Sequence, residues 1–426
     1  MKTLLITKTA IAGGAAILIA GLVAAAPAAQ ASNGRTVPCK TPALIAAIKA
    51  ANNSGGARIK LTPRCTYRLT TASSPNAMLG DTGLPVITSR ITLTGFHTTI
   101  AGNSSTFRIL MVTGSGKLTL NGLTITGGNT SGPGGGIFNL EGRLTLNHSR
   151  VTGNSSGGGM MAAGGGIASG TLNTGPVGTA VLNFSSVDHN TTTNSAGGIL
   201  NHGGTLILHA SRVADNTAAE GGGGIASGTG GQGGPRSSIL VVKFSVVSGN
   251  AANGGPMAGA GGISNGGTAA ITGSAIYGNT APGGAGGGIL NHGVMTVKAS
   301  KVSGNTAPAD SAGDQGNGGG IANINLAPVA QGAVNGGILT ITFSRISANT
   351  ASGAGGGIFE ATITQSGPSA GGPLTLKFSK VTGNKADQGG GIFAVPGSPV
   401  QQKFTVIARN IPDNCAPPGV VPGCTG

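Results

Sequence analysis

The sequence predicts an all-β solenoid, in which short β-coils are stacked on one another. One repeated signature is a run of glycines before an isoleucine, as in Gly134-Gly-Gly-Ile137, and its spacing ranges from 26 residues (Ile199 to Ile225) to 38 residues (Ile225 to Ile263). Its copies are centred on Ile137, Ile167, Ile199, Ile225, Ile263, Ile289, Ile321, Ile358 and Ile392. Repeats of this length are typical of solenoids, whose units bury their apolar faces only against their neighbours.

A second signature, Ser-x-Val-x-x-Asn, lies between the glycine runs, for example from Ser149 to Asn154 and from Ser300 to Asn305. Eight such units end at Asn154, Asn190, Asn216, Asn250, Asn279, Asn305, Asn349 and Asn384. Identical residues at one position of every coil are expected to stack as a buried amide ladder that satisfies backbone groups. The repeated asparagines are therefore interpreted as structural.

The segments inside each repeat favour strands over helices. Leu144-Thr-Leu146 and Leu374-Thr-Leu-Lys-Phe378 alternate apolar and polar residues with the period of a strand. Glycine occupies 83 of the 426 positions. Each glycine inside a helix would cost roughly 1 kcal/mol, so a helical solenoid is excluded.

The paired Gly-Gly-x-Ile and x-x-x-Asn tetrads resemble the repeats of polymorphic outer-membrane proteins. The chain as a whole, from about Ile87 to Ile407, looks like a right-handed parallel β-helix of the pectate-lyase-like superfamily. This resemblance implies a single right-handed β-helix. The repeats give it about ten coils, and residues near its start predict a short N-terminal capping helix. The tetrads differ from the outer-membrane repeats in beginning with Val or Ile rather than Phe.

Four regions are expected along the chain. Residues 1–31 have the basic start, apolar run and Ala29-Gln-Ala31 ending of a secretory signal peptide, whose removal leaves no stable membrane insertion. Residues 32–80 form an N-terminal cap, in which Thr41 is the N-cap of a helix that continues to Ala51. The β-helix covers residues 81–408, and residues 409–426 form a C-terminal disulfide tail.

The four cysteines allow three pairings. Cys39 and Cys65 are local to one end of the chain after the signal, and Cys415 and Cys424 are local to the other. We expect these two local disulfides, formed in an oxidising compartment. No histidine accompanies either pair at ligand spacing, so no metal site and no cofactor are expected.

The chain is basic, with a formal net charge of +15, and basic residues recur at fixed positions of the repeat. Stacking should bring equivalent positions together as a cationic track, because each coil lies directly on the one before it. The expected ligand-binding residues are Arg150, Arg212, Lys243, Lys298, Lys301, Arg345, Lys377 and Lys380. Such a track suits an anionic polymer, or it only keeps a β-surface soluble and unpaired.

Catalytic candidates are few, because the chain holds only 10 Asp and Glu residues. Glycoside hydrolysis needs two carboxylates together, and the alignment of repeats does not place Asp188 beside Asp215. It places His189 beside Asp215 on neighbouring coils, a possible base with its orienting partner, although a plain surface hydrogen bond is the other reading. The phenylalanines Phe184, Phe244, Phe343 and Phe378 share one position per coil and are interpreted as a core stack in preference to platforms for sugar rings.

Three functions are compatible with these patterns. The first is non-catalytic binding of an anionic polysaccharide or cell-envelope polymer by a secreted, extracellular or cell-wall-associated protein, with extracellular nucleic acid as a further partner. The second is a divergent polysaccharide lyase or hydrolase, the activity that the superfamily resemblance implies. The third is a structural surface or adhesion rod. The shortage of carboxylates favours the first and third.

Overall fold

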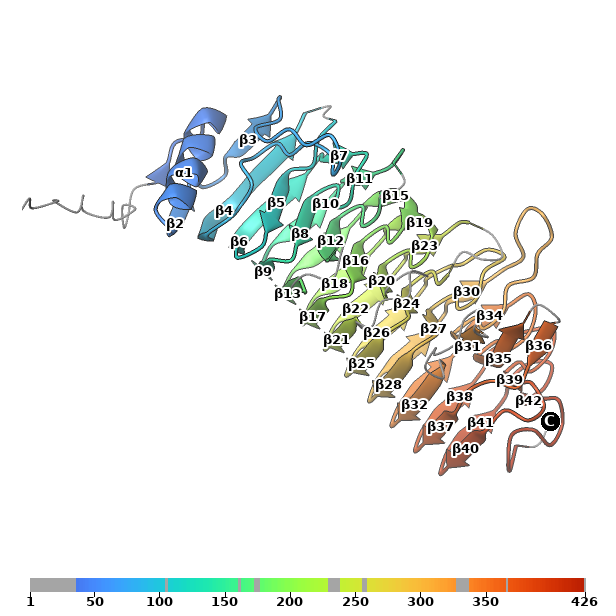
Figure 1. Cartoon of the computed structure of the whole chain (residues 1–426). Coiled ribbons are helices and arrows are strands. Elements are labelled where there is room, and N and C mark those ends of the chain that lie inside the picture. Colours follow the sequence, from blue (N-terminus) through green and yellow to red (C-terminus); the bar gives the residue numbers. More distant parts are fainter. Residues whose placement is uncertain are drawn as a thin grey trace, which may run out of the picture. The chain divides into compact units, whose positions relative to one another are not determined.

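The computed structural model describes residues 36–424, except 104–105, 160–161, 172–176, 229–237, 255–258, 327–336 and 365–366. The expected signal peptide lies outside the described residues. The described chain is a parallel β-helix, with its strands stacked side by side in sequence order and one helix at its beginning (Figure 1). The fold class expected from the repeats is therefore confirmed.

The N-terminal cap consists of β1 (Thr36–Val37) and α1 (Thr41–Asn53) packed against the first coil. Leu44, Ile48 and Ala51 form the buried face of the helix. The expected N-cap was wrong by one residue, because Lys40 holds the N-cap position and makes no side-chain capping bond. The Thr41 hydroxyl instead donates to the backbone oxygen of Arg68, 2.7 Å away, and so ties the helix to the first coil.

Each coil contributes two consecutive strands to the largest sheet. The first strands stack in the order β2 (Gly56–Leu61), β4 (Arg90–Gly102), β6 (Lys117–Thr126), β9 (Arg143–Asn147), β13 (Thr179–Asn183), β17 (Thr205–His209), β21 (Ile239–Lys243), β25 (Thr268–Thr272), β28 (Val294–Lys298), β32 (Ile338–Thr342), β37 (Leu374–Lys377) and β40 (Val400–Lys403). The stack exceeds the expected ten or so coils because the lead-in strand and the last segment also join it.

The second strands of the same coils form a parallel row beside the first. They are β3 (Thr66–Leu69), the later halves of β4 and β6, β10 (Arg150–Thr152), β14 (Ser186–Asp188), β18 (Arg212–Ala214), β22 (Val246–Ser248), β26 (Ala275–Tyr277), β29 (Lys301–Ser303), β33 (Arg345–Ser347), β38 (Lys380–Thr382) and β41 (Val406–Ala408). The register is continuous, so residues at one repeat position lie next to one another across many coils.

The glycine–isoleucine signature forms a second large sheet. Its strands are β5 (Leu110–Thr113), β8 (Ile137–Leu140), β12 (Ile167–Gly170), β16 (Ile199–His202), β20 (Ile225–Ser227), β24 (Ile263–Asn265), β27 (Ile289–Asn291), β31 (Ile321–Leu326), β35 (Ile358–Thr364), β39 (Ile392–Ala394) and β42 (Cys415–Ala416), with β36 (Gly367–Ser369) antiparallel to β35. Glycine is required before each isoleucine: a Cβ on Gly165 would lie 2.2 Å from the backbone oxygen of Thr191 on the next coil.

Short strands form the remaining side of the coils. One small sheet contains β7 (Asn129–Thr130), β11 (Ser155–Ser156), β15 (Thr191–Ser195), β19 (Thr217–Glu220) and β23 (Ala251–Ala252), and another pairs β30 (Thr306–Ala307) with β34 (Thr350–Ala351). The core between the sheets is filled by isoleucine, leucine and valine at the inward-facing strand positions, such as Ile199, Leu206 and Val213, which are inaccessible to solvent. Stacked apolar rows of this kind supply the hydrophobic stabilisation of the fold.

The asparagine ladder expected from the second signature is confirmed. The Asn190 amide donates to the Asn216 side-chain oxygen at 3.0 Å, and Asn216 donates in the same way to Asn250 at 2.9 Å. The same bond recurs between successive coils from Asn154 to Asn410. The ladder is buried and bonds backbone groups as well, so these asparagines hold the turn together and are not available to a ligand.

The two end disulfides expected from the sequence are present, joining Cys39 to Cys65 and Cys415 to Cys424. They close the first and last coils, where a stack has a neighbour on one side only. Among the described residues, no helix is long and apolar enough to cross a membrane.

Candidate functional site

One residue per coil forms the bend between the two strands of the largest sheet, and in five coils it is a phenylalanine. Phe244, between β21 and β22, has φ 51°, in the left-handed region. In a continuous strand the residue after the exposed Lys243 would point inward. The left-handed bend turns Phe244 outward instead and places the small Ser245 inside.

The phenylalanines are therefore on the surface, and their interpretation as a core stack was wrong. The exposed fractions are 55% for Phe184, 63% for Phe244, 57% for Phe343, 48% for Phe378 and 68% for Phe404. We call the residues at this position the bend row; from the fourth coil onward they are His148, Phe184, Ala210, Phe244, Gly273, Ala299, Phe343, Phe378 and Phe404. Exposed aromatic side chains in line form an apolar patch on the surface, which makes the bend row a candidate contact site.

The rings of the bend row stack on one another where they are adjacent. The ring centroids of Phe343 and Phe378 are 5.0 Å apart with an interplanar angle of 10°, and those of Phe378 and Phe404 are 5.1 Å apart. Nearer the N-terminus, His148 stacks on Phe184 at 5.2 Å. Each such pair covers one face of both rings, so free ring faces remain at the ends of the row and where it is interrupted.

Basic residues flank the bend row on both sides. Lys243, Lys298 and Lys377 directly precede the bend, and Arg150, Arg212, Lys301, Arg345 and Lys380 follow it by two positions. The structure brings three of the latter together on consecutive coils, because Lys301 is in register with Arg345 and Arg345 with Lys380. The two others lie on earlier coils, with Ser186 between Arg150 and Arg212.

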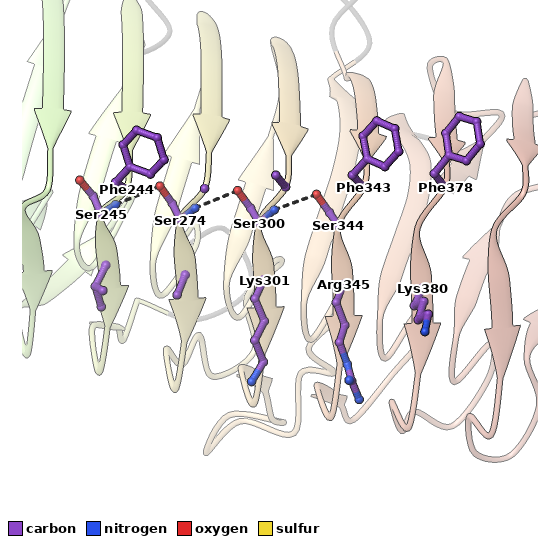
Figure 2. Close-up of a pocket in the computed structure, with 14 residues that line it drawn as sticks. Phe244, Ser245, Ser274, Ser300, Lys301, Phe343, Ser344, Arg345, Phe378 and Lys380 are labelled. Carbon is purple, nitrogen blue, oxygen red and sulfur yellow. Dashed lines mark hydrogen bonds between the residues drawn. The ribbon is translucent and has the colours of Figure 1, made fainter.

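A surface depression of about 490 Å³ lies over the coils that carry this basic cluster (Figure 2). Its residues are Phe244, Ser245, Val246, Gly273, Ser274, Ala275, Ala299, Ser300, Lys301, Phe343, Ser344, Arg345, Phe378 and Lys380. No acidic residue is among them, and none of its three cations forms an ion pair with a described carboxylate. The depression therefore combines aromatic rings with positive charges that have no internal counter-charge.

The floor of the depression is a row of serines whose hydrogen bonds are already made. The backbone N–H of Ser274 donates to the Ser300 hydroxyl oxygen at 3.1 Å, and the Ser300 hydroxyl donates to the Lys298 backbone oxygen at 2.8 Å. Figure 2 shows this row running beneath the rings. The floor serines are nearly buried, and their hydrogen bonds hold the bend in place.

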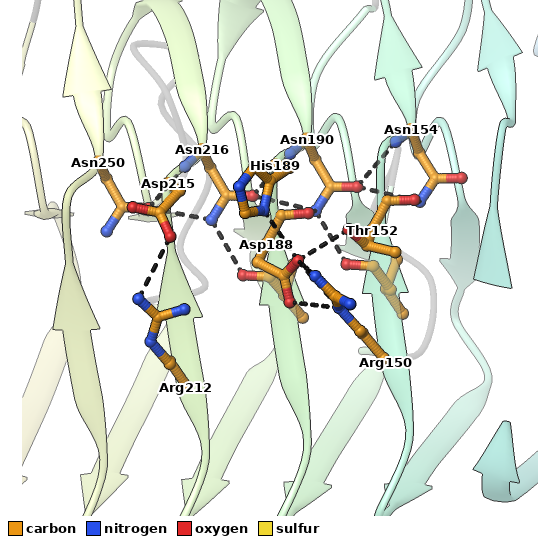
Figure 3. Close-up of polar contacts among 12 residues, drawn as sticks. Arg150, Thr152, Asn154, Asp188, His189, Asn190, Arg212, Asp215, Asn216 and Asn250 are labelled. Atoms are coloured by element: carbon orange, nitrogen blue, oxygen red, sulfur yellow. Dashed lines mark hydrogen bonds and ion pairs between the residues drawn. The ribbon is translucent and has the colours of Figure 1, made fainter. Parts of the chain in front are cut away.

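A second polar cluster surrounds Asp188, on coils nearer the N-terminus (Figure 3). Its carboxylate accepts bonds from Arg150 and from Thr152, the latter at 2.7 Å, and lies 3.0 Å from His189 Nδ1. The Asp188 side chain is only 3% exposed. Burial alone would raise its pKa, but the hydrogen bonds from Arg150, Thr152, His189 and Ser186 hold the pKa well below its usual range.

The structure gives His189 a different partner from the one expected. His189 and Asp215 do occupy equivalent positions, one residue beyond the paired Asp188 and Ala214. The Asp215 carboxylate, however, pairs with Arg212 at 3.2 Å, and His189 contacts the preceding residue Asp188. Neighbours in a strand normally point to opposite faces, so spacing alone did not reveal this contact. The left-handed bend at His189, φ 55°, makes it possible.

A third feature was not expected from the sequence. Glu360 is inaccessible to solvent and follows Asn323 in a polar row of the second large sheet. Burial raises the pKa of Glu360 to about 9, which keeps the carboxyl protonated at neutral pH. Among the described residues, no group of three histidines, cysteines or acids could hold a metal ion.

The fold and the depression together define a parallel β-helix protein with an outward row of aromatic rings and basic side chains. The chain resembles the A-module of mannuronan C-5 epimerase AlgE6 from Azotobacter vinelandii, with 16% identity over 89% of this chain and 95% of that one and a TM-score of 0.48. It also resembles the A-module of epimerase AlgE4 from the same organism, with 14% identity over 87% and 94% and a TM-score of 0.40.

A third similar structure is the Dettilon tailspike protein gp208, with 12% identity over 86% of this chain and 63% of that one and a TM-score of 0.31. No protein-family model and no curated sequence matches the chain. The resemblance of its repeats to those of polymorphic outer-membrane proteins therefore stays an expectation.

Proposed function

We propose that this protein binds an acidic polysaccharide outside the cell, without catalysis, through the depression on its largest sheet. The observation that supports the proposal is the set Lys301, Arg345 and Lys380, on consecutive coils beside the exposed rings of Phe343 and Phe378. Strands in register lie about 4.8 Å apart, so these like charges repel unless an anion or counterions neutralise them.

The surroundings favour a sugar polymer over a simple salt-neutralised surface. A β-surface that only needs protection from pairing would carry charges without large apolar side chains. Here the rings of the bend row are half exposed or more beside the charges. A pyranose ring with a carboxylate has one face of C–H groups and a negative edge, which match an aromatic ring and a cation.

An extracellular location is part of the proposal. It is supported by the two disulfides that close the ends of the coil stack, because disulfides persist in oxidising compartments. The signal-like residues 1–31 are consistent with it.

Titration with a polyuronate at low and high salt tests this function. We expect the wild-type protein to bind at low salt and to lose at least tenfold in affinity as the salt concentration is raised. The reason is that its lysine and arginine side chains displace counterions from the polymer when they bind. The variant Lys298→Gln, Lys301→Gln, Arg345→Gln should bind at least tenfold more weakly at low salt. A matched control, Lys49→Gln, Lys60→Gln, Arg68→Gln, removes the same charge from exposed positions near the N-terminus and should bind like the wild type.

Two results would contradict the proposal. Equal binding by both triple variants would mean that only net charge attracts the polymer. No binding by the wild type at low salt would leave the basic rows as a solvated face and favour the structural rod.

A second candidate function is a divergent polysaccharide lyase or hydrolase, and the Asp188–His189 contact favours it. The His189 side chain is 62% exposed, and a buried carboxylate holds its Nδ1 at 3.0 Å, which leaves Nε2 toward solvent. A histidine oriented in this way could accept a proton from a sugar. Assays for unsaturated products and new reducing ends on several polyuronates test it. Turnover that is lost in His189→Ala and Asp188→Asn would support it, and turnover that persists in both would remove this site.

A further inference from the structure

The bend row is interrupted once by two successive small residues. Between Phe244 and Phe343 it is occupied by Gly273 and Ala299, and Figure 2 shows no ring on these two coils. Three coil steps separate the two rings, or about 14 Å at 4.8 Å per step. We call this gap the slot. Elsewhere in the row adjacent rings are 5.0 to 5.2 Å apart and leave no space between them.

The slot presents ring faces that stacked pairs within the row conceal. Phe343 stacks on Phe378 with one face, and its other face borders the slot. On the far wall, Phe244 contacts the His209 ring on its N-terminal side, with centroids 6.1 Å apart and the ring planes at 88° to each other. No described ring contact joins Phe244 to Phe343. The Phe244 ring leans over Gly273, where an added Cβ would be 2.7 Å from its Cδ1 atom, so it forms the wall beside Gly273, and the space beyond it borders Phe343.

The slot is also flanked by charge at both of its ends. Lys298 precedes Ala299 on the same coil and Lys301 follows it by two positions, so the two lysines lie on opposite sides of the bend. Both are exposed. Arg345 reaches the same side as Lys301 from the next coil (Figure 2). A chain lying along the strands would therefore meet one cation where it enters and two where it leaves.

We propose that the acidic polysaccharide crosses the sheet through this slot, roughly along the strands, and does not run along the stack of coils. The inference rests on the proposed function and specifies how the polymer is held. One sugar ring lies between the aromatic walls with its C–H face on Phe343 or Phe244. Carboxylates on this ring or its neighbours meet Lys298 on one side and Lys301 with Arg345 on the other.

The recognised class follows from what lines the slot. The floor serines have their hydrogen bonds occupied within the sheet, so they do not read individual hydroxyl groups. Recognition depends on a flat apolar ring face and on acidic groups close to it. The slot thus selects polymers of acidic pyranoses as a class and discriminates weakly among hydroxyl configurations.

Crossing predicts a short binding length. The protein backbone from Lys298 to Lys301 spans at most about 10 Å, and a polysaccharide that crosses this distance covers it with about two or three sugar rings. Binding along the stack would instead involve the row Lys301, Arg345 and Lys380 and its neighbours, and would strengthen with each added sugar. The two arrangements therefore differ in how affinity depends on oligomer length.

Filling the slot provides the decisive variant. Ala299→Phe adds a ring at the repeat position that holds phenylalanine in later coils. The backbone conformation suits it, because φ is 49° at Ala299, 52° at Phe343 and 51° at Phe378. The matched control is Ala210→Phe, the same substitution at φ 47° in the same row. Ala210 lies outside the slot, in a one-coil gap that the His209 ring already occupies between Phe184 and Phe244.

The experiment measures binding of purified oligouronates of increasing length by calorimetry, for proteins shown to have the same melting temperature. We expect wild-type affinity to rise up to about three residues and then to level off. Ala299→Phe should weaken binding at least tenfold, and Ala210→Phe less than twofold.

Two outcomes would overturn the slot. In the first, wild-type affinity keeps rising with oligomer length and Ala299→Phe binds as tightly as the wild type. This result would place the polymer along the stack of coils and leave the proposed function intact. Tight binding of single-stranded DNA with no binding of oligouronates would refute the acidic glycan itself, and with it the proposed function.

Discussion

Asn323 donates a 2.7 Å hydrogen bond to Glu360, and this bond ends a row of asparagines and serines on the buried side of the second large sheet. In preceding coils the same bond links Asn265 to Asn291 and Asn291 to Asn323. Glu360 therefore accepts a hydrogen bond that the side-chain oxygen of an asparagine or glutamine could accept equally well, without burying an ionisable carboxyl group.

This relationship predicts that stability falls as pH rises. Glu360 has its pKa raised from 4.5 to about 9 on folding, so between these values the unfolded chain binds fewer protons than the native one. The free energy of unfolding therefore decreases as pH rises above 4.5, by up to about 3 kcal/mol at pH 7. Glu360→Gln keeps the acceptor for Asn323 and should raise the melting temperature at pH 7 to 8 but not at pH 4. Glu220→Gln, at an exposed position, should leave the melting temperature unchanged at both pH values. An equal rise in the melting temperature of Glu360→Gln at pH 4 and at pH 7 to 8 would refute the mechanism.

Asp188→Asn should destabilise the protein at neutral pH by about 2 kcal/mol, because hydrogen bonds to a buried carboxylate are stronger than those to an amide. The lowered pKa of Asp188 means that its contribution is present above about pH 4 and is lost as pH falls further. Denaturant unfolding at pH 7 and pH 3 measures this. Asp215→Asn is the control, since that carboxylate is 39% exposed and solvent screens its pair with Arg212. A larger loss in the control would contradict the assignment.

Breaking the asparagine ladder should be costly and local. Asn279→Ala removes the donor to Asn305 and the acceptor for Asn250, and leaves buried backbone groups unpaired, at a cost of about 3 kcal/mol. Hydrogen exchange should accelerate in the coils of Asn250 and Asn305 and much less toward the ends, because contacts in a solenoid are between neighbours. Tyr277→Phe, two residues away and 45% exposed, should have little effect.

Reduction of the disulfides should loosen the ends before the middle. Cys39–Cys65 and Cys415–Cys424 hold the terminal coils, which have a neighbouring coil on one side only. After reduction, exchange should rise first in β2 and β40 and last near β21, since a stack of nearest neighbours opens from its termini. Uniform opening along the chain would contradict this expectation.

The repeats in the sequence determined the architecture, because a solenoid depends on local periodicity. The recurrence of glycines directly before isoleucine, as at Ile199 and Ile225, was sufficient to predict stacked parallel coils, and the recurrence of Asn190 and Asn216 to predict the amide ladder. The alignment of repeats also identified which basic residues share a position, since register in a stack follows from sequence equivalence.

Only the tertiary structure decided which way the side chains of the bend point. Strand alternation assigned Phe343 to the core, but a left-handed residue reverses that alternation, and single residues in this conformation leave little trace in sequence. The same geometry joined His189 to Asp188 and exposed the gap at Gly273 and Ala299. The candidate site thus depends on backbone conformation at one residue per coil, which hydrophobic periodicity does not encode.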